Sequence, residues 1–193
     1  MIIDLSRETV PTKASIYDRI HFGVIRIVHE GLYGFFVNPY PLLTQAGLKR
    51  GQQVLEVGCG PGFFTAPAAK IVGETGHVCA LDINPAAVEH VREKIKRSGL
   101  ANVEAKLVDA SETGLPKESI DLAFLFGVMY SFKDVIKVLR EMHRVLKTKG
   151  TLSIQSGMPA DELREIVSGE RLFHFIDRTR RISIFEKLDA NNQ

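Results

Sequence analysis

A glycine-rich turn is the segment of this sequence best suited to hold a ligand. A short apolar run that contains Glu56 leads directly into Gly58, Gly60 and Gly62, with Cys59 between the first two glycines. Glycines at a turn between a strand and a helix can adopt positive φ and let the backbone approach a ligand closely. A helix that follows directs free N–H groups and a partial positive charge to the same place. The pattern predicts a nucleotide-sized site, with Glu56 beside the turn and Cys59 either lining the pocket or filling the core.

Two further acids stand where predicted strands end. Asp82 closes one apolar segment, and Asp109 follows the next one and precedes Ala110. The carboxyl ends of parallel strands meet at one edge of a sheet, where ligands of such sheets bind. We expect Asp82 to accept hydrogen bonds from a ribose diol, Ile83 to pack on an adenine ring, and Asp109 to accept from the adenine amino group. A helix cap or a solvated loop is the alternative for each acid taken alone.

The elements that must position these residues alternate along the chain. Apolar, strand-like segments separated by helix-like ones are typical of a parallel sheet with helices on both faces. After the strand that leads into the glycine turn, we expect strands at 77–82, 103–108, 120–126 and 151–155.

Helix signals lie between these strands. Asn84 is a suitable N-cap, Pro85 a suitable first helical residue and Gly99 a suitable stop. Apolar spacing predicts a strongly amphipathic helix over 135–146 and a short helix over 159–167.

The two ends of the chain add to this core. Segments 173–177 and 182–188 predict two closing strands, antiparallel because the link between them is too short for a crossover. Residues 1–50 predict a helical cap with helices at 15–30 and 39–46. The 193 residues are expected to form a single domain, of which 51–193 is the ligand-binding core.

Five segments resemble the class I S-adenosylmethionine (SAM)-dependent methyltransferases, in particular the subgroup of small-molecule and quinone-biosynthesis enzymes. The final turn departs from that subgroup, because Thr148-Lys149-Gly150 replaces its usual Pro-Gly-Gly. The resemblance implies an α/β fold: a Rossmann-like, doubly wound, seven-stranded sheet, mostly parallel with a reversed last strand, plus the N-terminal helical cap. It implies SAM as cofactor and S-adenosylhomocysteine as product. The matching segments are 54–64, 80–84, 108–110, 120–124 and 139–150.

The same resemblance, together with the strand-end acids, assigns site residues. Tyr130 follows the fourth strand and is a candidate for facing the substrate, with a packed tyrosine as the alternative. Tyr17 and His21 in the cap are further candidates, with a surface or core histidine as the alternative for His21. No residue is identified as a catalytic base. The residues assigned to the cofactor are Glu56, Gly58, Cys59, Gly60, Gly62, Asp82, Ile83, Asp109, Ala110, Phe126 and Gly127.

The acceptor is expected to be a small molecule. The Asn/Asp-Pro-Pro-aromatic motif, which enzymes of this fold that methylate DNA bases or glutamine often carry, is absent after the fourth strand. Aromatic residues of the cap suit an apolar or aromatic acceptor or contact with a membrane surface, and core packing is the alternative for them. These aromatic residues are Phe22, Tyr33, Phe35, Phe36 and Tyr40.

Composition excludes several other classes. A formal net charge of +2 is too small to indicate a nucleic-acid partner. No apolar run is long enough to cross a bilayer, and the start of the chain lacks the pattern of a secretory signal. The two cysteines indicate no disulfide framework, so a cytoplasmic location is expected. The six histidines and two cysteines show no spacing typical of a metal site.

Two rival functions remain at this point. An NAD-dependent oxidoreductase would need a third glycine at the position of Phe63, which the sequence lacks. A non-catalytic SAM-binding or partner-activating module would carry the same cofactor motifs.

Overall fold

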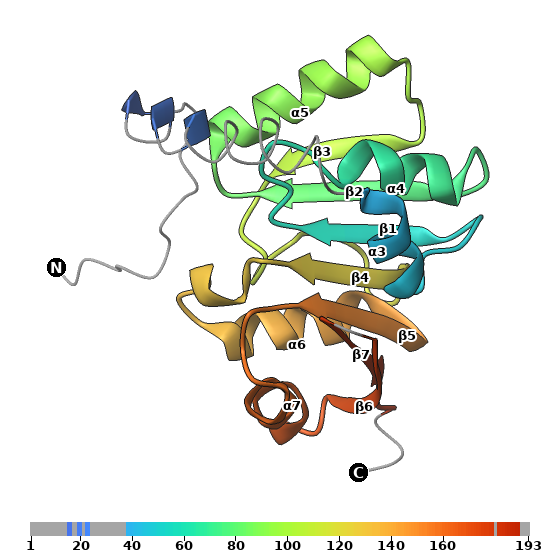
Figure 1. The fold of residues 1–193 in the computed structure, drawn as a ribbon, viewed down its shortest axis with the longest axis vertical. Coiled ribbons are helices and arrows are strands. Elements are labelled where there is room, and N and C mark those ends of the chain that lie inside the picture. Colours follow the sequence, from blue (N-terminus) through green and yellow to red (C-terminus); the bar gives the residue numbers. More distant parts are fainter. Residues whose placement is uncertain (1–14, 17–18, 21, 24–37, 180, 190–193) are drawn as a thin grey trace, which may run out of the picture.

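A seven-stranded sheet forms the centre of the molecule (Figure 1). The computed structural model describes residues 15–16, 19–20, 22–23, 38–179 and 181–189. The strand order is β3-β2-β1-β4-β5-β7-β6. The strands are β1 (Gln53–Val57), β2 (His77–Asp82), β3 (Val103–Leu107), β4 (Ile120–Phe126), β5 (Leu146–Gln155), β6 (Phe173–Thr179) and β7 (Ile182–Lys187).

The pairing of the strands confirms the expected fold class. β3, β2, β1, β4 and β5 are parallel, whereas β7 is antiparallel to both β5 and β6. β6 and β7 form the predicted hairpin, with β7 inserted between β5 and β6. The chain therefore has the Rossmann-like, doubly wound sheet with a reversed last strand.

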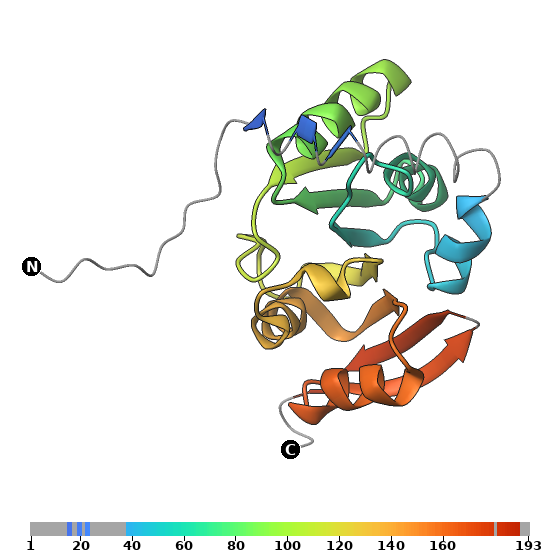
Figure 2. The ribbon, with the colours of Figure 1, turned by 60° about the vertical axis from the view of Figure 1, so that its left-hand side comes forward.

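Helices cover both faces of this sheet (Figures 1 and 2). One face carries α3 (Pro39–Gln45), α4 (Thr65–Val72) and α5 (Pro85–Ser98), and the other carries α6 (Val135–Val145) and α7 (Ala160–Gly169). Period-two alternation divides each strand between the two faces. In β1, Val54 packs with α3 and α4, while Leu55 and Val57 pack with α6.

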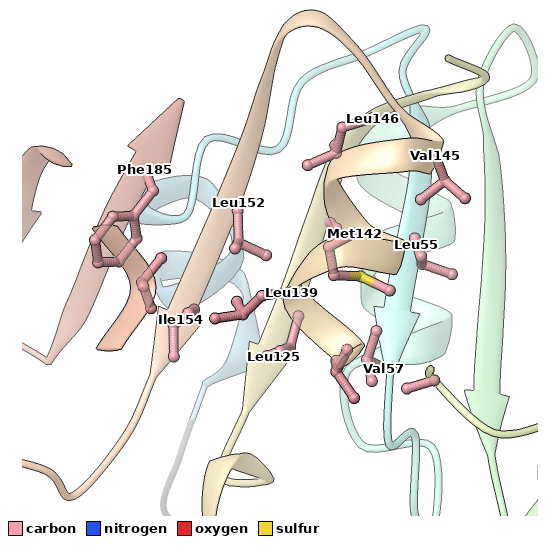
Figure 3. Close-up of a cluster of buried hydrophobic side chains, with 14 of the residues drawn as sticks. Leu55, Val57, Leu125, Leu139, Met142, Val145, Leu146, Leu152, Ile154 and Phe185 are labelled. Atoms are coloured by element: carbon pink, nitrogen blue, oxygen red, sulfur yellow. The ribbon is translucent and has the colours of Figure 1, made fainter. Parts of the chain in front are cut away.

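The larger core cluster lies under α6 (Figure 3). Leu139, Met142 and Val145 of α6 are fully buried among residues of β1, β4 and β5. The helix is amphipathic as its sequence predicts, so its apolar stripe fixes how it lies on the sheet.

Helix α5 begins and ends where its sequence predicts. The Asn84 side chain accepts a hydrogen bond from the Ala86 N–H at 2.9 Å, and Pro85 is the first helical residue. Gly99 ends the helix in the left-handed conformation.

The predicted boundary between α6 and the fifth strand is wrong. Leu146 was expected in the helix, but it is the first residue of β5 and has an extended backbone. Ile120 pairs with Leu146 whereas Leu122 pairs with Thr151, so β5 carries an irregularity that adds residues on its side. An apolar residue at helical spacing cannot be told from one that begins a strand, because both are buried.

Only part of the N-terminal cap can be compared with its prediction. Helix α3 confirms the short helix expected at 39–46, and its N-cap Asn38 accepts from the Tyr40 N–H. Phe22 is buried, and its ring lies 5.5 Å from that of His90 on α5. Of residues 1–37 the structure describes only 15–16, 19–20 and 22–23, of which 16, 19–20 and 22–23 are helical.

No helix among the described residues is long and apolar enough to cross a lipid bilayer.

Candidate functional site

The glycine turn after β1 is bound to the end of the neighbouring strand β2. The N–H groups of Gly58 and Cys59 both donate to the Leu81 carbonyl, at 2.8 and 2.9 Å. Gly58 has a φ of +73°, and a Cβ at this position would lie 2.5 Å from Cγ1 of Val128. Only glycine allows this close approach between the turn and the loop after β4.

Gly60, unlike Gly58, is not packed closely against another segment of the described chain. Its φ is +50°, and a Cβ added there would meet no atom of the described residues within 4 Å. The surface above Gly60 is therefore open, which leaves room for a ligand at the carboxyl edge of the sheet.

Asp82, at the end of β2, holds this turn in place. Its Oδ2 accepts from the Gly60 N–H at 2.9 Å, and its Oδ1 accepts from the Asn84 N–H at 2.8 Å. Burial raises the pKa of the Asp82 carboxyl, and these backbone hydrogen bonds offset only part of the increase. A carboxylate offers about four lone-pair sites in all, so Asp82 can still accept from a ligand.

Glu56 is a buried acid on the α4 side of β1. Its side chain is 2 % exposed, and its Oε2 has no hydrogen-bond partner among the described residues. Burial raises the pKa of Glu56 to about 8, and the nearby Asp82 carboxylate adds to this increase, whereas the Thr65 side chain and the charge of Lys94 lower the pKa. A buried carboxyl oxygen without a partner is costly, so a donor supplied by a ligand would stabilise it.

Thr65 is a neighbour that the sequence interpretation did not identify. It is the first residue of α4 and 2 % exposed; its Oγ1 makes no hydrogen bond of ordinary geometry within the described part of the chain, but its side chain lies near enough to Glu56 to lower the pKa of that carboxyl. Its position one helical turn from the glycines is the only sequence signal that could have revealed it.

The residues expected around an adenine ring lie in different environments. Ile83, after β2, is 55 % exposed, as a residue that packs on a ligand face would be. Asp109 is exposed, and its Oδ1 accepts from the Ser111 N–H at 2.7 Å. Ala110 is buried in the core cluster under α6. Their contacts with a cofactor stay predictions.

Three further predicted site residues are held by burial, by ring packing or by a backbone hydrogen bond. Cys59 is buried, and burial raises the pKa of its thiol well above the ordinary range. The Phe126 ring packs against Phe64 and Phe124, each with ring centroids 5.0 Å away. The Gly127 N–H donates to the Gln155 carbonyl at 2.9 Å.

The three expected substrate residues can be placed only in part. Tyr130 lies in the short 3-10 helix Met129–Ser131 after β4 and is 70 % exposed. Tyr17 and His21 lie outside the described residues. Within the described ranges, no group of three or more His, Cys, Asp or Glu side chains is arranged to hold a metal ion.

The sequence also matches a known domain family. Residues 48–185 match the family described as the methyltransferase domain, a range that includes β1 to β6, most of β7 and the whole glycine turn. The chain belongs to the class I SAM-dependent methyltransferases.

Curated relatives of this family support the assignment. The chain is 37% identical over 110 residues to the ubiquinone/menaquinone biosynthesis C-methyltransferase UbiE of Vibrio vulnificus, and 36% identical over 110 residues to UbiE of Escherichia coli. These alignments cover 56% of this chain but only 42% and 44% of the relatives. The chain thus matches less than half the length of these enzymes.

Solved structures show the same fold. A SAM-dependent methyltransferase from Aquifex aeolicus aligns with a TM-score of 0.70 at 24% identity, covering 87% of this chain and 96% of that one. A SAM-dependent methyltransferase from Methanococcus maripaludis, described as putative, aligns with a TM-score of 0.70 at 18% identity, covering 93% and 98%.

SAM, the methyl donor of the family, fits the residues at this site. The ammonium of its methionine end is a donor that Glu56 Oε2 lacks, and the open surface at Gly60 leaves space for the ligand. The carboxylate of Asp82 has acceptor capacity for the ribose diol.

Proposed function

We propose that this chain binds SAM at the carboxyl edge of the sheet and transfers its methyl group to a small-molecule acceptor by in-line displacement. The observation that carries the proposal is the arrangement of Glu56, Gly60 and Asp82. Asp82 fixes the open glycine turn through a hydrogen bond of 2.9 Å, and Glu56 has a buried carboxyl oxygen with no hydrogen-bond partner among the described residues.

In this proposal the chain acts mainly by binding and orientation. SAM supplies an electrophilic methyl group, so the protein need not provide a covalent nucleophile. Glu56 accepts from the ammonium, Asp82 accepts from the ribose hydroxyls, and Ile83 and Asp109 hold the adenine ring. Holding the acceptor atom in line with the bond that breaks can supply about 7–11 kcal/mol of the barrier in well-aligned cases.

The acceptor side of the proposal rests on the loop after β4. Tyr130 is a large aromatic side chain that is 70 % exposed at the carboxyl edge of the sheet, where it can face an acceptor. The curated relatives are named as C-methyltransferases of ubiquinone and menaquinone biosynthesis. An apolar or aromatic small molecule fits both the exposed Tyr130 ring and the quinone chemistry in the relatives' names. An acceptor of this kind would also suit contact with a membrane surface.

The non-catalytic alternative keeps the cofactor site but not the reaction. A SAM-binding module that activates a partner would use Glu56, Gly60 and Asp82 in the same way. The two functions therefore differ only in whether a methyl group leaves the cofactor.

The test has two steps. Native mass spectrometry of the purified chain should detect retained S-adenosylhomocysteine or SAM, and calorimetry should show that both bind far more tightly than NAD. Labelled SAM is then incubated with a panel of phenols, quinols, amines and carboxylic acids. Methyl transfer to one class supports the enzyme. Binding without transfer to any class favours the non-catalytic module, and absence of binding overturns the proposal.

A further inference from the structure

The loop between β3 and β4 carries a predicted cofactor residue but no helix of its own. Residues 108–119 cross from the carboxyl end of β3 to the start of β4 without forming a helix or strand. Asp109 and Ala110 stand at the beginning of this loop. Something outside the loop must fix its position if Asp109 is to meet an adenine ring in a constant geometry.

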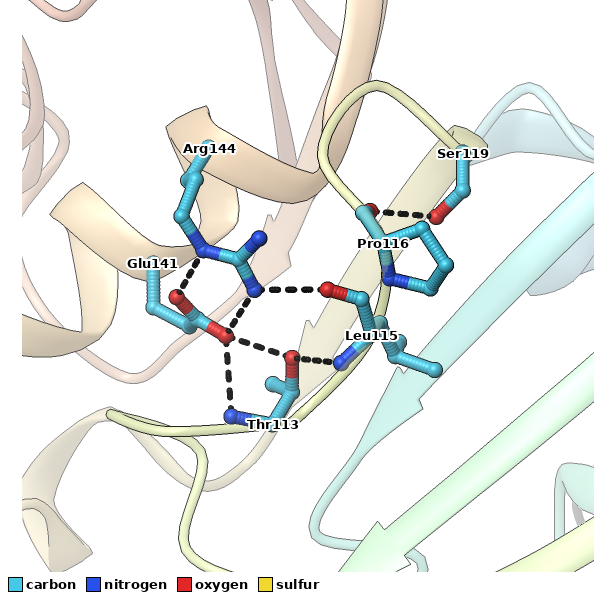
Figure 4. A network of polar contacts seen from close by, with 6 residues as sticks. All are labelled: Thr113, Leu115, Pro116, Ser119, Glu141 and Arg144. Atoms are coloured by element: carbon cyan, nitrogen blue, oxygen red, sulfur yellow. Dashed lines mark hydrogen bonds and ion pairs between the residues drawn. The ribbon is translucent and has the colours of Figure 1, made fainter.

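The carboxylate of Glu141, on α6, is bound to the middle of this loop (Figure 4). Its Oε1 accepts from the Thr113 N–H at 2.8 Å and from the Thr113 hydroxyl at 2.5 Å. The Thr113 Oγ1 in turn accepts from the Leu115 N–H at 3.2 Å. Thr113 is 4 % exposed and Glu141 9 % exposed, so these bonds are largely shielded from water.

Arg144, one helical turn further along α6, completes the arrangement. Its Nε donates to Glu141 Oε2 at 2.7 Å, and its Nη2 donates both to Glu141 Oε1 and to the Leu115 carbonyl, each at 2.8 Å. The Arg144 side chain therefore neutralises the buried Glu141 carboxylate and also binds a backbone carbonyl of the loop (Figure 4). The end of the loop is also attached to α6, because the Glu118 N–H donates to the Arg144 carbonyl.

A hydrogen-bonded turn connects Asp109 to Thr113, which Glu141 holds in place. The Glu112 N–H donates to the Asp109 carbonyl at 3.0 Å, and the Ser111 N–H donates to Asp109 Oδ1 at 2.7 Å. Ala110 is held in the core beneath them. Glu112 is directly followed by the anchored Thr113, so no free segment separates Asp109 from the Glu141 carboxylate.

We propose that Glu141, with Arg144 and Thr113, is a positioning residue that sets the geometry of the adenine-binding loop without touching the cofactor. The inference rests on the proposed function, because it takes Asp109 as the acceptor for the adenine amino group. Loss of the Glu141 carboxylate then weakens recognition of that amino group more than it alters the reaction.

The experiment compares two ligands that differ only at that group. S-adenosylhomocysteine and its purine analogue, in which hydrogen replaces the adenine 6-amino group and N1 stays an acceptor, are titrated against the parent chain, Glu141→Gln and Thr113→Val. The matched control is Glu170→Gln. Glu170 also pairs with an arginine of α6, Arg140, at 2.6 Å, but no hydrogen bond joins it to the loop.

We expect the parent and Glu170→Gln to prefer S-adenosylhomocysteine by about tenfold or more, the scale of a hydrogen bond to a charged group. In Glu141→Gln and Thr113→Val this preference should shrink towards one. With SAM varied at a saturating concentration of an acceptor found in the panel above, the KM for SAM should rise while kcat changes by less than about twofold.

Several results separate this inference from its alternatives. Equal loss of affinity for both ligands, with the preference intact, would mean that Glu141 only stabilises the fold and would overturn the inference. A parent chain that binds both ligands equally would also overturn it, because Asp109 would not recognise the amino group. A parent that binds neither ligand contradicts the proposed function itself. If Glu141→Gln does not fold, Thr113→Val decides, since it keeps the shape of the side chain and removes only the hydroxyl.

Discussion

The N–H of Gly60 donates a hydrogen bond of 2.9 Å to Oδ2 of Asp82, which joins the turn after β1 to the end of β2. The two residues lie far apart in the sequence but meet at the carboxyl edge of the sheet. An acid expected only to bind a ribose therefore also shapes the glycine turn. Changes at Asp82 should act on the cofactor through both routes.

Replacing Asp82 with Asn tests this double role. The amide can accept through one oxygen only, so one of the backbone N–H groups of Gly60 and Asn84 loses its acceptor. A hydrogen bond to a charged group is worth about 1.5–3 kcal/mol, so affinity for S-adenosylhomocysteine should fall about tenfold or more. Calorimetry measures the affinity.

Asp121 provides the matched control for Asp82. Its Oδ2 accepts from the Gln53 N–H at 2.7 Å, but it lies at the opposite, amino edge of the sheet. Asp121→Asn should lower the unfolding free energy without changing the affinity for S-adenosylhomocysteine. Equal loss of affinity in both variants would show that Asp82 acts only through stability.

Replacing Gly60 with Ala separates backbone strain from loss of ligand space. A left-handed conformation costs a non-glycine residue roughly 1–2 kcal/mol, and the new Cβ meets no atom of the described residues within 4 Å. Gly99, which ends α5, also has a positive φ, of +63°, and a Cβ added to it likewise meets no described atom within 4 Å. Gly60→Ala and Gly99→Ala should therefore lose similar stability in urea unfolding. Only Gly60→Ala should lose binding of S-adenosylhomocysteine, and retained binding would place the cofactor away from Gly60.

Local signals allowed much of this fold to be predicted from the sequence. Asn84 and Gly99 act through neighbouring backbone groups, so the ends of α5 can be read from adjacent residues. The apolar strands and the hairpin of β6 and β7 follow from short-range patterns in the same way. The boundary at Leu146 could not be predicted, because pairing with Ile120 in a distant strand draws it out of the helix.

In the candidate site, too, residues revealed by local sequence patterns could be predicted, and residues held by contacts between distant segments could not. The turn and its acids were identified because glycine spacing and strand ends are visible in the sequence. The contact of Val128 with Gly58 and the bonds of Glu141 to Thr113 join distant segments, so no local pattern reveals them. In the sequence, Glu141 looks like any other charged residue of an amphipathic helix.

Glu141 should make the stability of the chain depend on acid pH. Burial raises the pKa of Glu141, but hydrogen bonds from Arg144 and Thr113 outweigh it, so the pKa lies below the ordinary 4.5. A lowered pKa in the folded state contributes stability that is complete above about pH 4.5 and is lost as the pH falls through the folded-state value. Urea unfolding at several pH values should show Glu141→Gln lowering the free energy of unfolding by about 1–3 kcal/mol at pH 7 and by progressively less below pH 4.5.

The Glu170→Gln control, which removes a more exposed ion pair, should lower the free energy of unfolding by at most about 1 kcal/mol. A deficit that does not shrink in acid would contradict the role assigned to the carboxylate.

Glu56 should make ligand-free stability fall as the pH rises. Its pKa is about 8 in the folded chain, against an ordinary value of 4.5. Between these two values the unfolded chain ionises Glu56 while the folded chain keeps it protonated, so unfolding becomes easier with increasing pH. Glu56→Gln cannot ionise and should flatten this slope in urea unfolding between pH 5 and pH 8. A slope identical to that of the parent would mean that Glu56 does not carry the effect.

The same carboxyl group should release a proton when the cofactor binds. At pH 7 the free chain holds Glu56 largely protonated, since its pKa is about 8. The ammonium of S-adenosylhomocysteine, placed against Glu56 Oε2, favours the ionised form and lowers that pKa, so up to about one proton leaves on binding. Calorimetry in phosphate and in Tris measures it, because the observed enthalpy then changes with the ionisation enthalpy of the buffer.

Two variants make this measurement specific to Glu56. Glu56→Gln should bind S-adenosylhomocysteine more weakly and with the same enthalpy in both buffers, whereas Asp121→Asn should release as many protons as the parent. Proton release that persists in Glu56→Gln would assign the titrating group to another residue. Parent binding without any buffer dependence would mean that the ammonium does not reach Glu56, and the methionine end of the cofactor would then need a different partner at this edge of the sheet.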